Sequence, residues 1–97
     1  MSYVMYLDDE RECPVESWVV ARSSAEARDL VERRGLPMYM CLDHDLGGDD
    51  TTMVFLRWLC DTYFDEGPPS YSVHSANPVG RDNIIGYLEG WKRALTT

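Results

Sequence analysis

Residues 38–50 read MYMCLDHDLGGDD, an apolar run that passes directly into a cluster of acids. The run at 38–42 predicts a buried strand, because it is short, apolar and soon followed by glycines that end regular structure. Residues 43–50 then place four aspartates and a histidine in eight positions. Carboxylates this close raise one another's pKa and destabilise the fold unless a cation shares their site. The stretch therefore predicts a strand whose end carries a cation-binding site.

Strands and helices alternate along the rest of the chain. β-Branched and aromatic segments predict further strands at residues 3–7, 18–22 and 71–74. Ser23 and Glu26 form a capping box at the start of a helix that ends at Gly35. Apolar residues at helical spacing predict a second helix over about 51–64. Asn77 and Pro78 then predict the start of a third helix.

This alternation favours a parallel sheet with right-handed crossovers, the architecture of an α/β fold. The connection at residues 8–17 contains Pro14 and is at the lower length limit for joining parallel strands, so we expect a loop there. A fifth strand is not recognisable. Because 97 residues support one hydrophobic core, we expect a single domain over residues 1–97 with a parallel sheet of about four strands.

The composition limits the partners and the compartment. The chain has 17 acidic against 9 basic residues, whereas proteins that bind extended nucleic acids neutralise phosphates with lysine and arginine. Extended nucleic-acid binding is therefore not expected, while a phosphorylated small molecule or an RNA end is compatible with the charge. No segment has the pattern of a signal peptide or of a membrane helix, so we expect a cytoplasmic protein without a membrane partner. The three cysteines form no C-x-x-C pair, and Cys41 and Cys60 are expected to pack as small apolar residues.

Polar residues follow three of the four predicted strands: Asp8 and Asp9 the first, residues 43–45 the third, and His74 with Ser75 the fourth. The carboxyl ends of parallel strands meet at one edge of a sheet, where α/β proteins bind their ligands. Neighbouring strands lie about 4.8 Å apart, so these side chains should converge. We expect Asp8, Asp9 and Asp43 to bind a divalent cation, and hard oxygen ligands favour Mg²⁺ or Mn²⁺.

The sequence allows more than one role for several residues near this predicted site. Asp45 offers the cation either its carboxylate or its backbone carbonyl. His74 is a ligand, a general acid or base, or a histidine that only hydrogen-bonds its neighbours. Arg11 and Arg81, each just past a strand end, are the best-placed residues to bind a phosphate. The two aspartates at 49 and 50 are expected to cap the helix that follows them.

The acids after the first and third strands, with Ser75 after the fourth, resemble the site of response-regulator receiver domains. There, paired acids hold Mg²⁺ and the later aspartate accepts a phosphoryl group. This chain differs from that pattern: a loop replaces the first helix, the fifth strand and its lysine are missing, and His44 and His74 are added. A closer resemblance is to the cyclic-phosphate processing receiver domain family of bacteria and their viruses. Its pattern is similar to residues 7–11 with Pro14, residues 22–23, residues 43–47, and residues 74–80 leading to 83–84.

The resemblance implies a small receiver-like, flavodoxin-like, three-layer fold and a role in processing cyclic phosphates. It leads to the hypothesis of a metal-dependent phosphoesterase that acts on a cyclic phosphate of a nucleotide, a nucleotide-sugar or an RNA end. Asp43 would be the nucleophile or base and His74 the acid, and Arg81, Arg11 and Ser75 would complete the catalytic set.

The alternative is a non-catalytic phosphate-binding, metal-binding or phosphoacceptor module that acts through a protein partner, so enzyme activity is left open. Two further hypotheses are that the protein inhibits another protein through its acidic surface, or that it is a scaffold that retains its acids only as surface charge.

Overall fold

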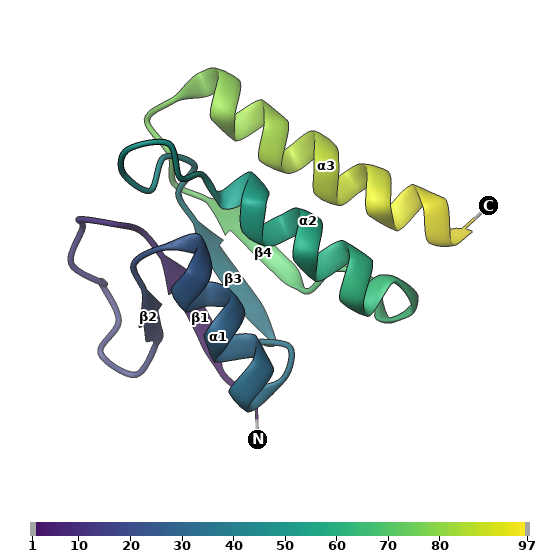
Figure 1. The fold of residues 1–97 in the computed structure, drawn as a ribbon, viewed down its shortest axis with the longest axis horizontal. Helices are drawn as coiled ribbons and strands as arrows, with labels where there is room; N and C mark the ends of the chain where they lie inside the picture. The colour runs from purple at the N-terminus through teal and green to yellow at the C-terminus, as the bar shows by residue number, and fades with distance from the viewer. Residues whose placement is uncertain (1, 97) are drawn as a thin grey trace.

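The computed structural model describes residues 2–96, which form one parallel sheet and three α-helices (Figure 1). The four strands are β1 (Val4–Leu7), β2 (Val19–Ala21), β3 (Tyr39–Leu42) and β4 (Ser70–Val73). The helices are α1 (Ser24–Arg34), α2 (Thr52–Tyr63) and α3 (Pro78–Thr96), with a single 3-10 turn (Phe64–Glu66) after α2. The strand order is β2-β1-β3-β4, and every pair is parallel. The predicted α/β class and the four-stranded parallel sheet are confirmed.

The helix boundaries follow the capping signals in the sequence. The Ser23 side chain accepts a hydrogen bond from the Glu26 amide at the start of α1. At its end, Gly35 adopts φ 82°, a left-handed conformation that favours glycine, and its amide donates to the Val31 carbonyl. Asn77 caps α3 by accepting a hydrogen bond from the Gly80 amide at 3.1 Å. These predicted caps are confirmed because they depend on residues close together in the chain.

One face of the sheet packs against the helices and forms the core. Side chains alternate between the two faces along each strand, so Met5 and Leu7 on β1 align with Met40 and Leu42 on β3. All four are fully buried. Each helix adds apolar residues to the same cluster: Leu30 and Val31 from α1, Phe55, Leu56 and Leu59 from α2, and Ile84, Leu88 and Trp91 from α3.

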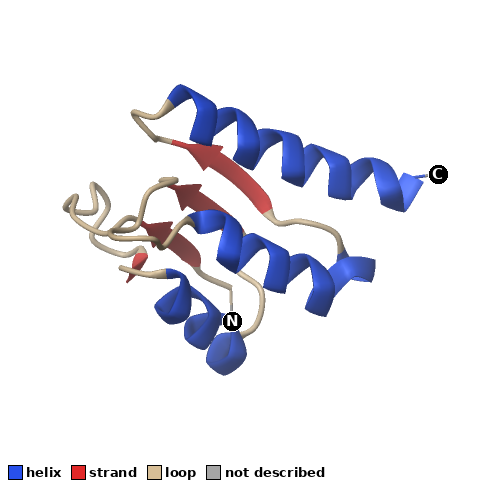
Figure 2. Cartoon of the chain, turned by 45° about the horizontal axis from the view of Figure 1, so that its top comes forward, coloured by secondary structure: helices blue, strands red, loops and turns tan. Residues whose placement is uncertain are grey.

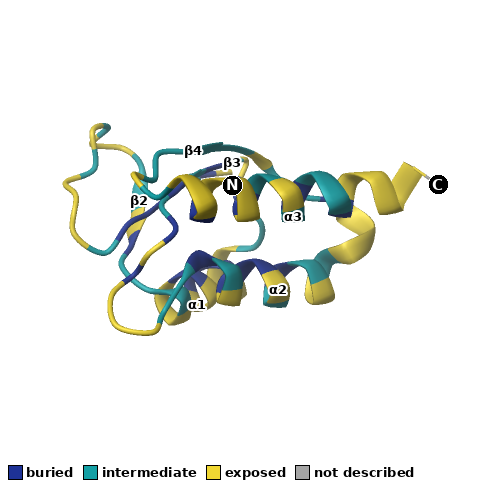
Figure 3. Ribbon diagram, turned by 90° about the horizontal axis from the view of Figure 1, so that it is seen from above, coloured by how far each residue is buried: buried dark blue, intermediate teal, exposed yellow. Residues whose placement is uncertain are grey.

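The expected three-layer arrangement is wrong: the described chain, residues 2–96, has two layers, with the helices on one face of the sheet (Figures 2 and 3). The reason is the direction in which the chain crosses the sheet. From β2 to β3 and from β3 to β4 it moves the same way across the strand order, so right-handed crossovers place α1 and α2 on the same face. The β1-to-β2 connection moves the opposite way, and it is a loop, as predicted.

The described part of the chain lacks both a fifth strand and a membrane-spanning helix. Within residues 2–96 there is no fifth strand, so β4 is an edge strand of the sheet. None of the helices formed by these residues is both long enough and apolar enough to cross a bilayer.

Candidate functional site at the carboxyl edge of the sheet

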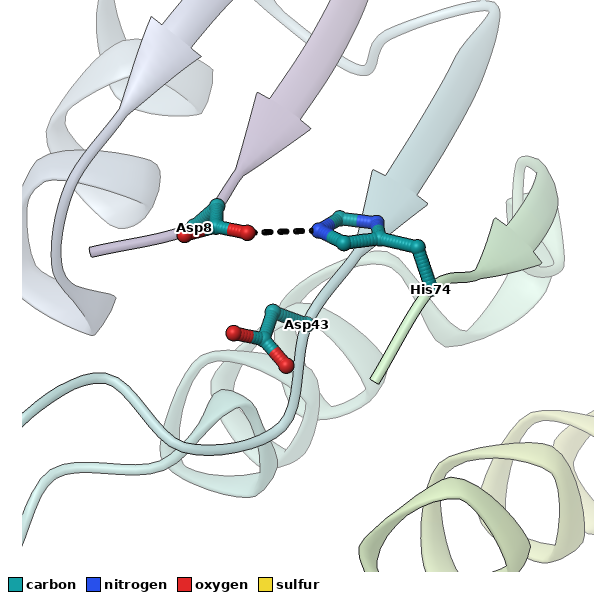
Figure 4. A group of neighbouring side chains, drawn as sticks. All are labelled: Asp8, Asp43 and His74. Atoms are coloured by element: carbon teal, nitrogen blue, oxygen red, sulfur yellow. Dashed lines mark hydrogen bonds and ion pairs between the residues drawn. The ribbon is translucent and has the colours of Figure 1, made fainter. Parts of the chain in front are cut away.

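Three side chains from three different strand ends meet at the carboxyl edge of the sheet. Asp8 follows β1, Asp43 follows β3 and His74 follows β4. The parallel pairing continues one residue past the strands, because the Asp43 amide donates to the Leu7 carbonyl and the His74 amide to the Leu42 carbonyl, both at 2.9 Å. One ligand atom from each of the three side chains lies within 4.8 Å of the others (Figure 4). The predicted convergence of these strand ends is therefore confirmed.

Asp8 is a buried carboxylate held by several donors. Its side chain is 1% exposed. One oxygen accepts the amides of Glu10 (2.9 Å) and Arg11 (2.8 Å), and the other accepts His74 Nε2 (2.8 Å) with the Arg11 guanidinium 3.5 Å away. Burial alone would raise the pKa of Asp8, but these hydrogen bonds outweigh it, so the pKa lies below its ordinary value. Asp8 is therefore a charged anchor for the loop that follows β1.

His74 contacts three residues in or directly after the neighbouring strands, and its side chain is 22% exposed. Its Nε2 contacts Asp8, its Nδ1 lies 3.2 Å from the Cys41 sulfur, and its ring stacks on Tyr6 with centroids 4.9 Å apart. Sequence reasoning missed Tyr6 and assigned Cys41 to apolar packing, which is wrong. Both residues alternate with core residues along their strands, a pattern that places them on the face away from the helices.

An open acidic cavity of about 430 Å³ lies next to this cluster. Three of the four predicted metal ligands, Asp9, Asp43 and Asp45, line it. The predicted catalytic residues Arg11 and Ser75 line it too, together with Glu10, Gly47, Gly48, Ala76 and Asn77. Asp8 and His74 are not part of this lining, so they support the cavity from beside Asp43.

Two of the acids that line the cavity, Asp43 and Asp45, also hold the loop after β3 in place through hydrogen bonds. Asp45 pairs with His44 Nδ1 at 3.1 Å and accepts Asn77 Nδ2 at 3.2 Å, and these two hydrogen bonds lower the pKa of Asp45. Asp43 Oδ1 accepts the His44 amide at 2.8 Å, and the Asp43 carbonyl accepts the Thr52 hydroxyl. Among the described residues Asp43 Oδ2 has no hydrogen-bond partner, so it remains available to a ligand.

His44 fixes the position of this loop against α3. Its side chain is buried, and its Nε2 has no hydrogen-bond partner within residues 2–96. A Cβ added at Gly80 would lie 2.4 Å from His44 Cγ, so only glycine allows the first turn of α3 to approach this closely. His44 therefore packs beneath α3, and its Nδ1 reaches Asp45 at the cavity.

Three other polar residues, Arg81, Arg22 and Asp50, lie outside the lining of the acidic cavity. Arg81 donates to the Val73 carbonyl at 2.8 Å and lines a different cavity, of about 490 Å³, at the edge of β4. Arg22 donates to the carbonyls of Asp8 and Arg11 and so holds the β1–β2 loop. Asp50 caps α1, by accepting the amide and hydroxyl of Ser24, whereas the sequence predicted that it caps α2.

The order β2-β1-β3-β4, with acids at the carboxyl ends of the two central strands, defines a receiver-like domain. Comparison with family models matches residues 3–90 to the cyclic-phosphate processing receiver domain. The chain therefore belongs to the cyclic-phosphate processing receiver domain family, as its sequence motifs predict. Neither the curated proteins nor the solved structures gave a match.

Proposed function

We propose that this protein is a divalent-metal-dependent phosphoesterase that hydrolyses a cyclic phosphate, carried by a nucleotide, a nucleotide-sugar or an RNA end. The observation that carries the proposal is the lining of the acidic cavity: Asp9, Asp43 and Asp45 share it with the guanidinium-bearing Arg11 and the hydroxyl of Ser75. Carboxylates suit a hard cation, and a guanidinium suits phosphate oxygens. The family name, cyclic-phosphate processing, points to the same class of ligand.

The donor set fits Mg²⁺ or Mn²⁺. Asp9, Asp43 and Asp45 line the cavity with hard oxygen ligands and would hold the ion. Asp45 would do so beside its hydrogen bonds with His44 and Asn77, whereas Asp8 does not line the cavity and is held by His74. When bound, such an ion neutralises phosphate oxygens and lowers the pKa of a water molecule. It would also relieve the repulsion between the three carboxylates.

The remaining chemistry belongs to residues of the chain. Arg11 binds and orients the phosphate from the cavity wall, helped by the Ser75 hydroxyl. Asp43 accepts a proton from the attacking water, or itself attacks phosphorus to give an aspartyl phosphate that water then hydrolyses. A new P–O bond forms, one ring P–O bond breaks, and the leaving ring oxygen takes a proton. His74, whose Nε2 lies next to Asp43, is the proposed donor of that proton, and it would give up its hydrogen bond with Asp8 to deliver the proton to the leaving oxygen.

The test is a panel of nucleotide, nucleotide-sugar and RNA-end cyclic phosphates, incubated with Mg²⁺, Mn²⁺ or EDTA. We expect turnover that requires the metal and is lost in Asp43→Asn. Asp49→Asn is the matched control, because Asp49 carries the same charge on the same loop, is exposed and does not line the cavity. Mg²⁺ should raise the melting temperature of the unsubstituted protein and of Asp49→Asn, but not of Asp43→Asn.

Two results would contradict the phosphoesterase. Phosphorylation of Asp43 by a small phosphodonor without any cyclic-phosphate hydrolysis would establish the phosphoacceptor module that acts through a protein partner. Identical melting curves with and without metal, together with no turnover, would leave the acids as surface charge.

A further inference from the structure

The face of the sheet that points away from the helices has its own set of side chains. Tyr6, Tyr39 and Cys41 alternate with core residues along β1 and β3, so they lie on this face. Trp18, directly before β2, joins them through ring contacts with both tyrosines. The strand residues on this face are all uncharged: Val4, Tyr6, Val20, Tyr39, Cys41, Ser70 and Ser72. No helix of the described chain covers it (Figure 3).

Four rings on this face form a continuous row that leads to the acidic site, called here the aromatic row: Tyr39, Trp18, Tyr6 and His74. Ring centroids lie 6.4 Å apart for Tyr39 and Trp18, 6.3 Å for Trp18 and Tyr6, and 4.9 Å for Tyr6 and His74. Tyr6 is only 4% exposed, whereas Trp18 and Tyr39 are partly exposed. The row therefore has accessible rings at both ends: His74, 22% exposed, at the cavity, and Trp18 with Tyr39 at the end away from it.

We propose that Trp18 and Tyr39 form a stacking site for a base of a short single-stranded RNA whose 3′-terminal cyclic phosphate occupies the acidic cavity. This inference rests on the proposed function and narrows its substrate class. Bases stack on aromatic side chains of open sheets, and this contribution needs no basic residues. An uncharged aromatic face on a chain of net charge -8 suits that mode of binding, in which bases rather than the phosphate backbone supply the affinity.

The spacing of the rings decides which base occupies the site. Trp18 lies two ring contacts from His74, and the cavity lies beyond His74 on the side of Asp43. A base that stacks on Trp18 is therefore too far from the cavity to belong to the nucleotide that carries the terminal phosphate. The base of the preceding nucleotide fits this distance, so at least a dinucleotide is needed to occupy both ends of the row.

The experiment compares three ligands that share the cyclic phosphate, in the presence of Mg²⁺. They are an adenine dinucleotide with a 3′-terminal 2′,3′-cyclic phosphate, adenosine 2′,3′-cyclic phosphate and glycerol cyclic phosphate, each as the phosphorothioate to slow hydrolysis. Titration calorimetry gives the Kd for the unsubstituted protein, Trp18→Leu and Trp18→Phe. Trp58→Leu is the matched control, because Trp58 lies on α2 and packs against the core on the helical side.

Loss of one stacked base typically costs about 1–3 kcal/mol, or roughly 5- to 150-fold in Kd. We expect a weakening of that size for the dinucleotide in Trp18→Leu, partial retention in Trp18→Phe, and no change in Trp58→Leu. Binding of the glycerol ligand should be unchanged in all variants. If Trp18→Leu does not fold, as judged by circular dichroism, Tyr39→Leu replaces it with the same expectation.

The outcomes separate this inference from the function on which it rests. If all three ligands bind and Trp18→Leu and Tyr39→Leu bind the dinucleotide as tightly as the unsubstituted protein, the stacking site is refuted and the phosphoesterase stands. If adenosine cyclic phosphate depends on Trp18 as strongly as the dinucleotide does, the RNA end is refuted in favour of a mononucleotide. If no ligand binds, both proposals fail.

Discussion

Replacement of Gly80 by alanine tests the contact between the loop after β3 and the first turn of α3. The new Cβ would lie 2.4 Å from His44 Cγ, 2.6 Å from Nδ1 and 2.8 Å from Cβ. These atoms are close to the His44 backbone, so a simple rotation of the ring cannot remove all three contacts. His44 or the start of α3 must move, and the pairing of His44 with Asp45 at the cavity would be disturbed.

The magnitude follows from two opposing effects. Alanine is favoured over glycine inside a helix by about 1 kcal/mol. Insertion of a methyl group into a packed site costs about 1–3 kcal/mol, and contacts this short belong in the upper part of that range. We therefore expect Gly80→Ala to lower the free energy of unfolding by about 1–2 kcal/mol, which is roughly 4–16 °C in melting temperature for a domain of this size.

The matched control lies in the same helix. A Cβ at Gly86 meets nothing within 4 Å, so Gly86→Ala should gain up to about 1 kcal/mol from helix propensity alone. Urea unfolding followed by circular dichroism measures both variants. In a His44→Ala background, which lacks Cγ and Nδ1, the penalty of Gly80→Ala should shrink. Equal stabilisation by Gly80→Ala and Gly86→Ala would refute the close packing of His44 beneath α3.

Two further predictions concern parts of the fold away from the cavity. Asp50→Ala should destabilise the protein by about 1 kcal/mol, because the Ser24 amide and hydroxyl at the start of α1 lose their acceptor. Amide hydrogen exchange should then become faster in α1, and faster exchange in α2 instead would contradict the role of Asp50 as a cap of α1. Burial raises the pKa of Tyr3 to about 12, whereas the same tyrosine in the unfolded chain has a pKa near 10. The protonated Tyr3 hydroxyl therefore contributes its full stabilisation below pH 10, and this contribution is lost as the pH rises to 12. Denaturation midpoints between pH 9 and 12 should therefore fall less steeply in Tyr3→Phe, and parallel curves would count against this.

The sequence by itself determined the local structure and the location of the site. Ser23, Gly35 and Asn77 mark helix ends because their caps involve residues a few positions away in the chain. Acids directly after strands predicted the convergence of Asp8 and Asp43, since the carboxyl ends of adjacent parallel strands must lie side by side.

Only the tertiary structure decided which partners those residues have. Within residues 2–96, the helices lie on one face of the sheet because of the direction of each crossover, which depends on the strand order. Asp50 caps a helix that lies earlier in the chain, and Arg81 turns to the edge of β4. His74 meets Cys41 and stacks on Tyr6 because three strands bring their outward faces together. Hydrophobic periodicity specifies which face of an element is buried, but contacts between distant residues depend on how whole elements pack.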